Sequence, residues 1–166
     1  MKSLFTAFSS LFFSLTCCNA QISEDLKINA VSIELGKTGL IYNLTFDHKL
    51  ASKNLGFRFG AGSNLGQYLD VTSVGGGGYY LVGSKTKFLE LGLDIQYLIV
   101  DEVSDDQKGI VSIFVYPNYS VETVYTSLNL GYRCYGKKSL FRVGVSPGII
   151  KSKLIPGGYI SYGITF

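Results

Sequence analysis

The chain has 166 residues, enough for one domain, and carries a formal net charge of +3. A charge this small gives no indication of a nucleic-acid partner. Twenty glycines, 12 tyrosines and 11 phenylalanines accompany only 16% charged residues, a composition that fits a β-protein facing lipid.

The first twenty residues have the features of a secretory signal peptide. Lys2 supplies the positive start, residues 4–15 are mainly apolar, and Cys18-Asn19-Ala20 is a small-residue cleavage site. A transmembrane anchor and a lipid on Cys18 are the alternatives. The apolar stretch is short for an anchor, and Cys17 is a poor residue to precede a lipidated cysteine. We therefore predict a signal peptide at 1–20 and one exported domain at 21–166.

From residue 29 onward, apolar and polar side chains alternate with period two, which predicts strands. No later segment approaches the roughly 18–20 apolar residues of a spanning helix, so a membrane-spanning form has to use strands. The chain is predicted to be all-β. The eight expected strands are 29–36, 39–49, 55–65, 70–83, 87–99, 122–135, 139–149 and 157–166.

Segment 87–99 shows the two faces most clearly. One face carries leucines, an isoleucine and a tyrosine, and the other carries Glu90, Gly92, Asp94 and Gln96. The interior of an eight-stranded barrel is just wide enough for side chains to fill, so we expect the small and polar face inside. The bulky apolar face then points to lipid. A soluble barrel of the lipocalin type, with the apolar face inside, is the alternative.

The last residues alternate up to the final phenylalanine. Ile160, Tyr162, Ile164 and Phe166 share one face of this segment. Termini usually fray, whereas a closed barrel ends readily inside a strand, and closure removes the unpaired edges that hydrocarbon forbids. We predict an eight-stranded antiparallel transmembrane β-barrel in the outer membrane of a Gram-negative bacterium.

The connections alternate between two kinds. The expected periplasmic turns are 48–54, 83–87 and 136–138, and the expected outer loops are 36–39, 63–69, 100–122 and 151–157. Apart from 36–39, this is the usual asymmetry of short inner turns and longer outer loops. Residues 110–116 alternate in part, but a ninth strand breaks the even count, so we interpret 100–122 as a hairpin above the membrane.

Six stretches match the pattern and order of a known group of proteins. They are 29–36 (NAVSIELG), 39–46 (GLIYNLTF), 87–93 (KFLELGL), 130–133 (LGYR), 140–147 (LFRVGVSP) and 155–166 (IPGGYISYGITF). In these the chain resembles the small bacterial outer-membrane β-barrel proteins with a signal ending in Ala-Gln and a C-terminal Phe. The resemblance implies insertion by the barrel-assembly machinery, which reads a terminal aromatic strand such as Tyr162, Ile164 and Phe166. It implies no settled activity. The chain departs from the pattern at 100–122 and at Gly75–Gly78, where bulkier residues are expected.

Seven charged residues are expected to point into the lumen. They are Glu34, Asp47, Arg58, Glu90, Asp94, Arg133 and Arg142. Unpaired buried charges are costly, so we expect a packed network of ion pairs that fills the lumen. A polar ligand site or an ion path is the alternative.

Motifs for catalysis or cofactor binding are weak. Residues 78–86 (GYYLVGSKT) nearly spell a phosphate-binding loop, but an extra serine separates the glycine from the lysine, and a strand follows. His48 is the only histidine and has no evident serine and acid beside it. One histidine and one mature cysteine are too few for a metal site. We expect no catalytic residue, cofactor or metal.

The sequence thus predicts a non-enzymatic membrane protein whose outer loops, chiefly 100–122, contact surface partners or stabilise the envelope. The expected partners are outer-membrane lipid and, during insertion, the assembly machinery, with no nucleic acid; the surface partner is unknown. A narrow channel or small-solute binder using the lumen charges is the alternative. A third hypothesis is an enzyme acting on lipid at the barrel wall through His48.

Overall fold

The computed structural model describes residues 29–37, 42–50, 54–63, 71–100, 123–150 and 152–166. All of its regular elements in these ranges are strands, as the period-two pattern predicts. They are β1 (Asn29–Leu35), β2 (Tyr42–Lys49), β3 (Leu55–Ser63), β4 (Val71–Ser84), β5 (Lys87–Val100), β6 (Thr123–Tyr135), β7 (Ser139–Val145), β8 (Gly148–Ile150), β9 (Lys153–Ile155) and β10 (Gly158–Thr165). The described residues include no helix long and apolar enough to cross a membrane.

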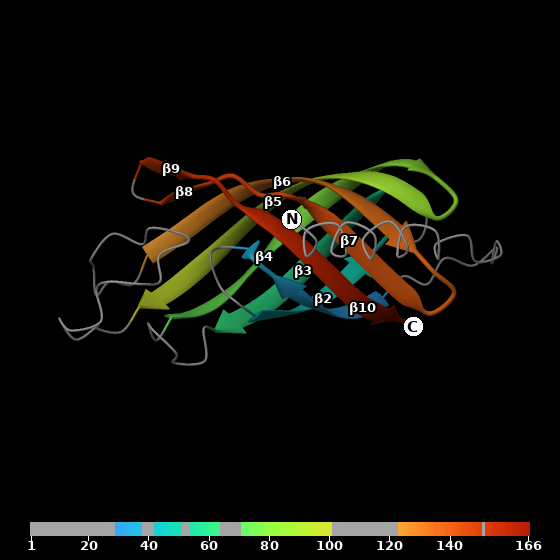
Figure 1. Cartoon of the computed structure of the whole chain (residues 1–166), viewed down its shortest axis with the longest axis horizontal. Coiled ribbons are helices and arrows are strands. Elements are labelled where there is room, and N and C mark those ends of the chain that lie inside the picture. The colour runs from blue at the N-terminus through green and yellow to red at the C-terminus, as the bar shows by residue number, and fades with distance from the viewer. Residues whose placement is uncertain (1–28, 38–41, 51–53, 64–70, 101–122, 151) are drawn as a thin grey trace, which may run out of the picture.

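The strands close into an antiparallel barrel (Figure 1). β1 to β6 pair in chain order, β6 pairs with β7, β7 with β10, and β10 with β1. β7 and β8 keep one register against β6, and β9 and β10 keep one register against β7 and β8, so each pair forms a single interrupted strand. The described residues therefore form a closed eight-stranded barrel, which confirms the predicted fold class.

Two prolines interrupt the last hairpin at the same level. Gly148 pairs with Ile155, and the Ser146 N–H donates to the carbonyl of Gly157 at 2.8 Å, so Pro147 lies opposite Pro156. Neither proline donates a backbone hydrogen bond, yet pairing resumes beyond them. The prediction of an outer loop at 151–157 is therefore wrong, because Lys153–Ile155 is a strand.

The two faces of the wall divide as predicted. On β5, Leu91 and Ile95 are 48% and 54% exposed on the outside, whereas Glu90 and Asp94 are 0% and 1% exposed inside. The other barrel strands show the same alternation, with large apolar side chains exposed on the outer face. An apolar belt of this extent aggregates in water but fits the hydrocarbon of a bilayer. The soluble-barrel alternative is therefore wrong.

The Gly75–Gly78 run lies within β4, opposite β3. Gly76 faces outward beneath the Phe59 ring, since a Cβ added to it would lie 2.7 Å from a ring carbon. Gly77 faces inward, where an added Cβ would lie 2.0 Å from the Asp94 carboxylate. The bulkier residues expected here do not fit at Gly75, Gly76 or Gly77, because backbone and side-chain atoms of the neighbouring strands use the space.

Candidate functional site: the charged lumen

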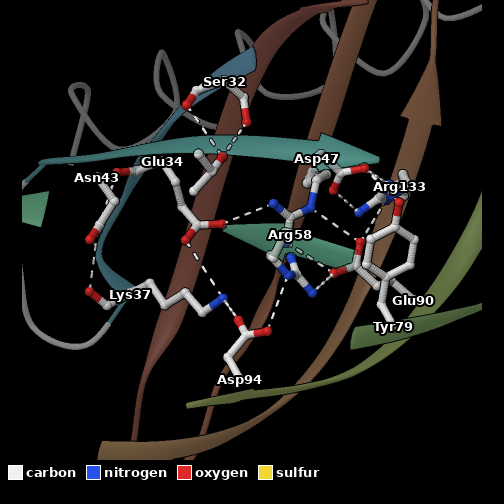
Figure 2. A network of polar contacts seen from close by, with 12 residues as sticks. Ser32, Glu34, Lys37, Asn43, Asp47, Arg58, Tyr79, Glu90, Asp94 and Arg133 are labelled. Carbon is white, nitrogen blue, oxygen red and sulfur yellow. Dashed lines mark hydrogen bonds and ion pairs between the residues drawn. The ribbon is translucent and has the colours of Figure 1, made fainter. Parts of the chain in front are cut away.

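The structure places all seven sequence-predicted charges inside the barrel, each less than a tenth exposed. Glu34 lies on β1, Asp47 on β2, Arg58 on β3, Glu90 and Asp94 on β5, Arg133 on β6, and Arg142 on β7. Lys37, which the sequence reasoning missed, joins them from just beyond β1 and is 1% exposed. Figure 2 shows this network with most of its members labelled.

Glu90 is the centre of the network and is fully buried. Its Oε1 accepts hydrogen bonds from Nη2 of Arg58 at 2.6 Å and Nη2 of Arg142 at 2.9 Å. Its Oε2 accepts from Nε of Arg133 at 2.7 Å and Nε of Arg142 at 3.1 Å. Charge-assisted bonds of this kind are the strong ones. One carboxylate thus joins β5 to β3, β6 and β7.

Arg133 links Glu90 to β2. Its Nη1 and Nη2 bind the two oxygens of Asp47 at 3.0 and 2.8 Å, a bidentate pair. The same Nη1 donates to the hydroxyl of Tyr135 at 2.8 Å. The guanidinium also lies 4.0 Å above the centre of the Tyr79 ring, whose hydroxyl donates to Asp47. Every polar edge of this guanidinium has an interaction that offsets part of its desolvation.

The second half of the network lies toward the outer mouth. Arg58 Nε lies 3.2 Å from Asp94 Oδ1, and Arg142 Nη1 donates to Glu34 at 3.1 Å. Lys37 contacts Asp94 and lies 3.8 Å from Glu34, so one ammonium lies between two carboxylates (Figure 2). Lys37 lies beyond the strand pattern, after Gly36 with φ +87°, a turn that the period-two pattern does not reveal.

Four acids and four cations balance the network. The acids are Glu34, Asp47, Glu90 and Asp94, and the cations are Lys37, Arg58, Arg133 and Arg142. The acids are held by guanidinium or ammonium groups, and the described residues include no group of three or more His, Cys, Asp or Glu suited to a metal ion. The arrangement neutralises and fills the lumen.

Glycines on the inner wall provide room for the aromatic side chains among these charges. Gly56 lies opposite Tyr79, and a Cβ there would lie 2.2 Å from that ring. Gly131 and Gly144 lie beneath Tyr159. The centre of the Tyr159 ring is 5.1 Å from the guanidinium carbon of Arg142. The glycine-rich composition therefore has a structural use, because an eight-stranded barrel has no other space for large inward side chains.

Apolar clusters occupy the lumen on both sides of the network. At the end that carries the short turns, the cluster consists of Ala30, Tyr79, Leu81, Phe88, Tyr135 and Leu140. At the opposite end, Leu98, Tyr125 and Ile150 pack together with Ile155. A hydrated ion has to displace both clusters and the network to cross, and such side chains offer it no replacement for its water.

The remaining sequence-predicted residues lie elsewhere. Tyr162, Ile164 and Phe166 are exposed by 57% or more on the outer face of the last strand. His48 Nδ1 lies 2.8 Å from the Asn29 side-chain oxygen, and its ring packs on Phe57 at 4.9 Å. These contacts position the histidine against neighbouring strands. The 100–122 segment lies almost wholly outside the described residues.

Comparisons with known proteins agree on architecture only. No protein-family model and no curated protein matches the chain. Among solved structures, the N-terminal β-barrel domain of Pseudomonas aeruginosa OprF matches at 10% identity and a TM-score of 0.63, covering 85% of this chain and 100% of that one.

Two further structures have lower scores. Yersinia pestis Ail matches at 12% identity and a TM-score of 0.46, covering 85% of this chain and 100% of that one. Neisserial surface protein A matches at 12% identity and 0.42, covering 83% and 93%. The fold comparison therefore rests on the OprF domain. Together with the closed wall and its apolar belt, it shows that the chain has the eight-stranded fold of an outer-membrane β-barrel.

Proposed function

We propose that this protein is a non-conducting, non-enzymatic barrel that acts through its outer loops, by contacting surface partners or stabilising the envelope. The observation that carries the proposal is the filled lumen. A balanced network crosses the barrel from β2 to β6, and apolar clusters lie on both sides of it. A filled barrel is a rigid scaffold, and binding residues in such proteins are usually on the loops that the scaffold positions.

The lumen also bears on the enzymatic alternative. Glu90 and Asp94 are the two acids of β5, and arginines bind both of them. A general acid or nucleophile needs access to substrate and a tuned proton affinity. His48 contacts an asparagine and a phenylalanine. Neither arrangement favours hydrolysis, so the outer loops remain the preferred functional region.

The test of the proposal is a loop replacement. Residues 103–120 are exchanged for a short Gly-Ser linker, and the variant is expressed in a strain lacking the wild-type gene. The barrel should still fold, since the ion pairs among the described residues lie outside this segment, and its unheated band should still migrate ahead of the boiled one. Resistance of the cells to detergent and their attachment to surfaces should drop to the level of the deletion strain. Full rescue by the shortened barrel would contradict the proposal.

The channel alternative predicts the opposite electrical behaviour. We expect purified barrel in a planar bilayer to show no discrete conductance steps, because three filled layers close the lumen. A matched variant, Leu98→Ser with Ile150→Ser, makes the outer cluster polar and leaves the network intact. It should also remain silent. Regular, cation- or anion-selective steps from the wild type would instead favour a narrow channel.

A further inference from the structure

Four exposed lysines gather at one rim of the barrel. Lys85 and Lys87 lie at the turn between β4 and β5, and Lys137 and Lys138 lie at the turn between β6 and β7. All four side chains are exposed. This end has the short turns, so it corresponds to the periplasmic end of such a barrel (Figure 1).

The two turns are direct neighbours. The N–H of Tyr135, at the end of β6, donates to the carbonyl of Thr86 at 2.8 Å, and Lys87 pairs with Cys134 across β5 and β6. The carbonyl of Lys138 accepts from Thr165 at 3.1 Å. The lysines therefore form one continuous patch, which we call the lysine rim, over β4 to β7 and the end of β10.

No acid on the described surface balances the lysine rim. Every described aspartate and glutamate is buried in the lumen, where a cation of the network holds it. Among the side chains that the structure describes, these lysines are the only charged ones that are exposed. The rim thus presents four positive charges. At the ionic strength of a cell, the electrostatic potential of each charge extends over a Debye length of roughly 8 Å.

The lysine rim borders the apolar belt. Lys87 faces outward on the same side of β5 as Leu89, which is 56% exposed to lipid. Successive outward residues of a strand are separated by about 7 Å. An ammonium at that position, on a flexible apolar stem, lies at the height of the lipid phosphates rather than in the hydrocarbon.

We propose that the lysine rim binds the phosphate groups of acidic phospholipids in the inner leaflet of the outer membrane. The patch of four ammonium groups matches the negative charge of such head groups, and the outward direction of Lys87 places it beside the acyl chains of the same lipids. An acidic polymer of the periplasm is the competing partner. The lipid is favoured because one rim lysine lies on the lipid-facing side of the wall.

The test uses the folded barrel in phosphatidylcholine vesicles that contain a trace of spin-labelled lipid. The immobilised fraction of the spectrum gives the association of labelled phosphatidylglycerol relative to labelled phosphatidylcholine. Each lysine near an anionic surface raises the association constant a few-fold, so we expect a preference of about 5-fold or more for phosphatidylglycerol. The variant Lys85→Gln, Lys87→Gln, Lys137→Gln, Lys138→Gln should lose it. The matched variant with arginine at the same four positions should keep it, and 1 M salt should weaken it.

Two results would overturn the proposal. One is equal association of both lipids with the wild-type barrel. The other is a preference that persists in the four-glutamine variant while that variant still shows a heat-modifiable band. Binding to purified peptidoglycan that depends on the same lysines, without a lipid preference, would assign the rim to the polymer instead.

Discussion

Replacing Glu90 by glutamine is expected to destabilise the barrel by about 3–5 kcal/mol, since removing one partner of a buried ion pair leaves uncompensated charge. Glu90 binds three guanidinium groups, from Arg58, Arg133 and Arg142. The amide keeps the size of the side chain and removes the negative charge at the centre. The measurement is urea unfolding of the barrel in phospholipid vesicles, followed through loss of the fast-migrating unheated band.

A second variant separates the charge effect from loss of packing. Glu90→Gln combined with Arg58→Met removes one charge of each sign, so the numbers of acids and cations in the network are again equal. Asp94 loses its contact with Arg58 in this variant. We expect the double variant to be more stable than the sum of the single changes indicates. A loss below about 1 kcal/mol for Glu90→Gln alone would show that the network is not a major source of stability.

Adjacent glycines of β4 are expected to respond in opposite ways to alanine. A Cβ at Gly77 would lie 2.1 Å from the carbonyl oxygen of Leu93 and 2.0 Å from Asp94, both on the paired strand. A backbone atom cannot rotate away, so Gly77→Ala should cost about 1–3 kcal/mol through overpacking. At Gly78 the only neighbour of an added Cβ is a carbonyl oxygen 3.8 Å away. Gly78→Ala should therefore change stability by less than ~0.5 kcal/mol.

The same vesicle unfolding assay compares the two variants. They differ in position by one residue and have the same change in chain entropy, so propensity alone predicts equal effects. Equal stabilities would mean that the β4–β5 contact at Asp94 relaxes freely. A larger loss at Gly78 would show that the inward and outward faces of β4 are reversed.

The fold was predictable because a strand has an exact period. Once Leu89 faces lipid, Glu90 has to face the lumen, and the same parity holds for the other inward charges. The pairing partners were not predictable, since they depend on the tilt and register of strands far apart in sequence. Asp47 and Arg133 are 86 residues apart, and period two says nothing about which guanidinium reaches which carboxylate.

Two errors have local causes. Lys37 follows a glycine turn, where the pattern ends and the backbone direction is set by a positive φ. The segment from Lys153 to Ile155 resembles a loop, because prolines on both strands normally mark strand ends. Here Pro147 and Pro156 face each other, so the interruption falls on one level of the ladder. The sequence shows two breakers but not that they coincide.

The lumen network joins residues that are far apart in sequence, and this affects when the barrel gains its stability. Arg142 binds Glu34 across 108 residues of chain, and this contact forms only when the last strand has returned to the first. Before closure, Glu34 has the nearby Lys37 and Arg142 has Glu90 as partners, but the two do not yet bind each other. The last hairpin thus adds its own backbone contacts and also brings β7 and β1 together for the Arg142–Glu34 pair. Closure therefore completes the neutralisation of the network, and we expect it to make folding of this barrel more cooperative.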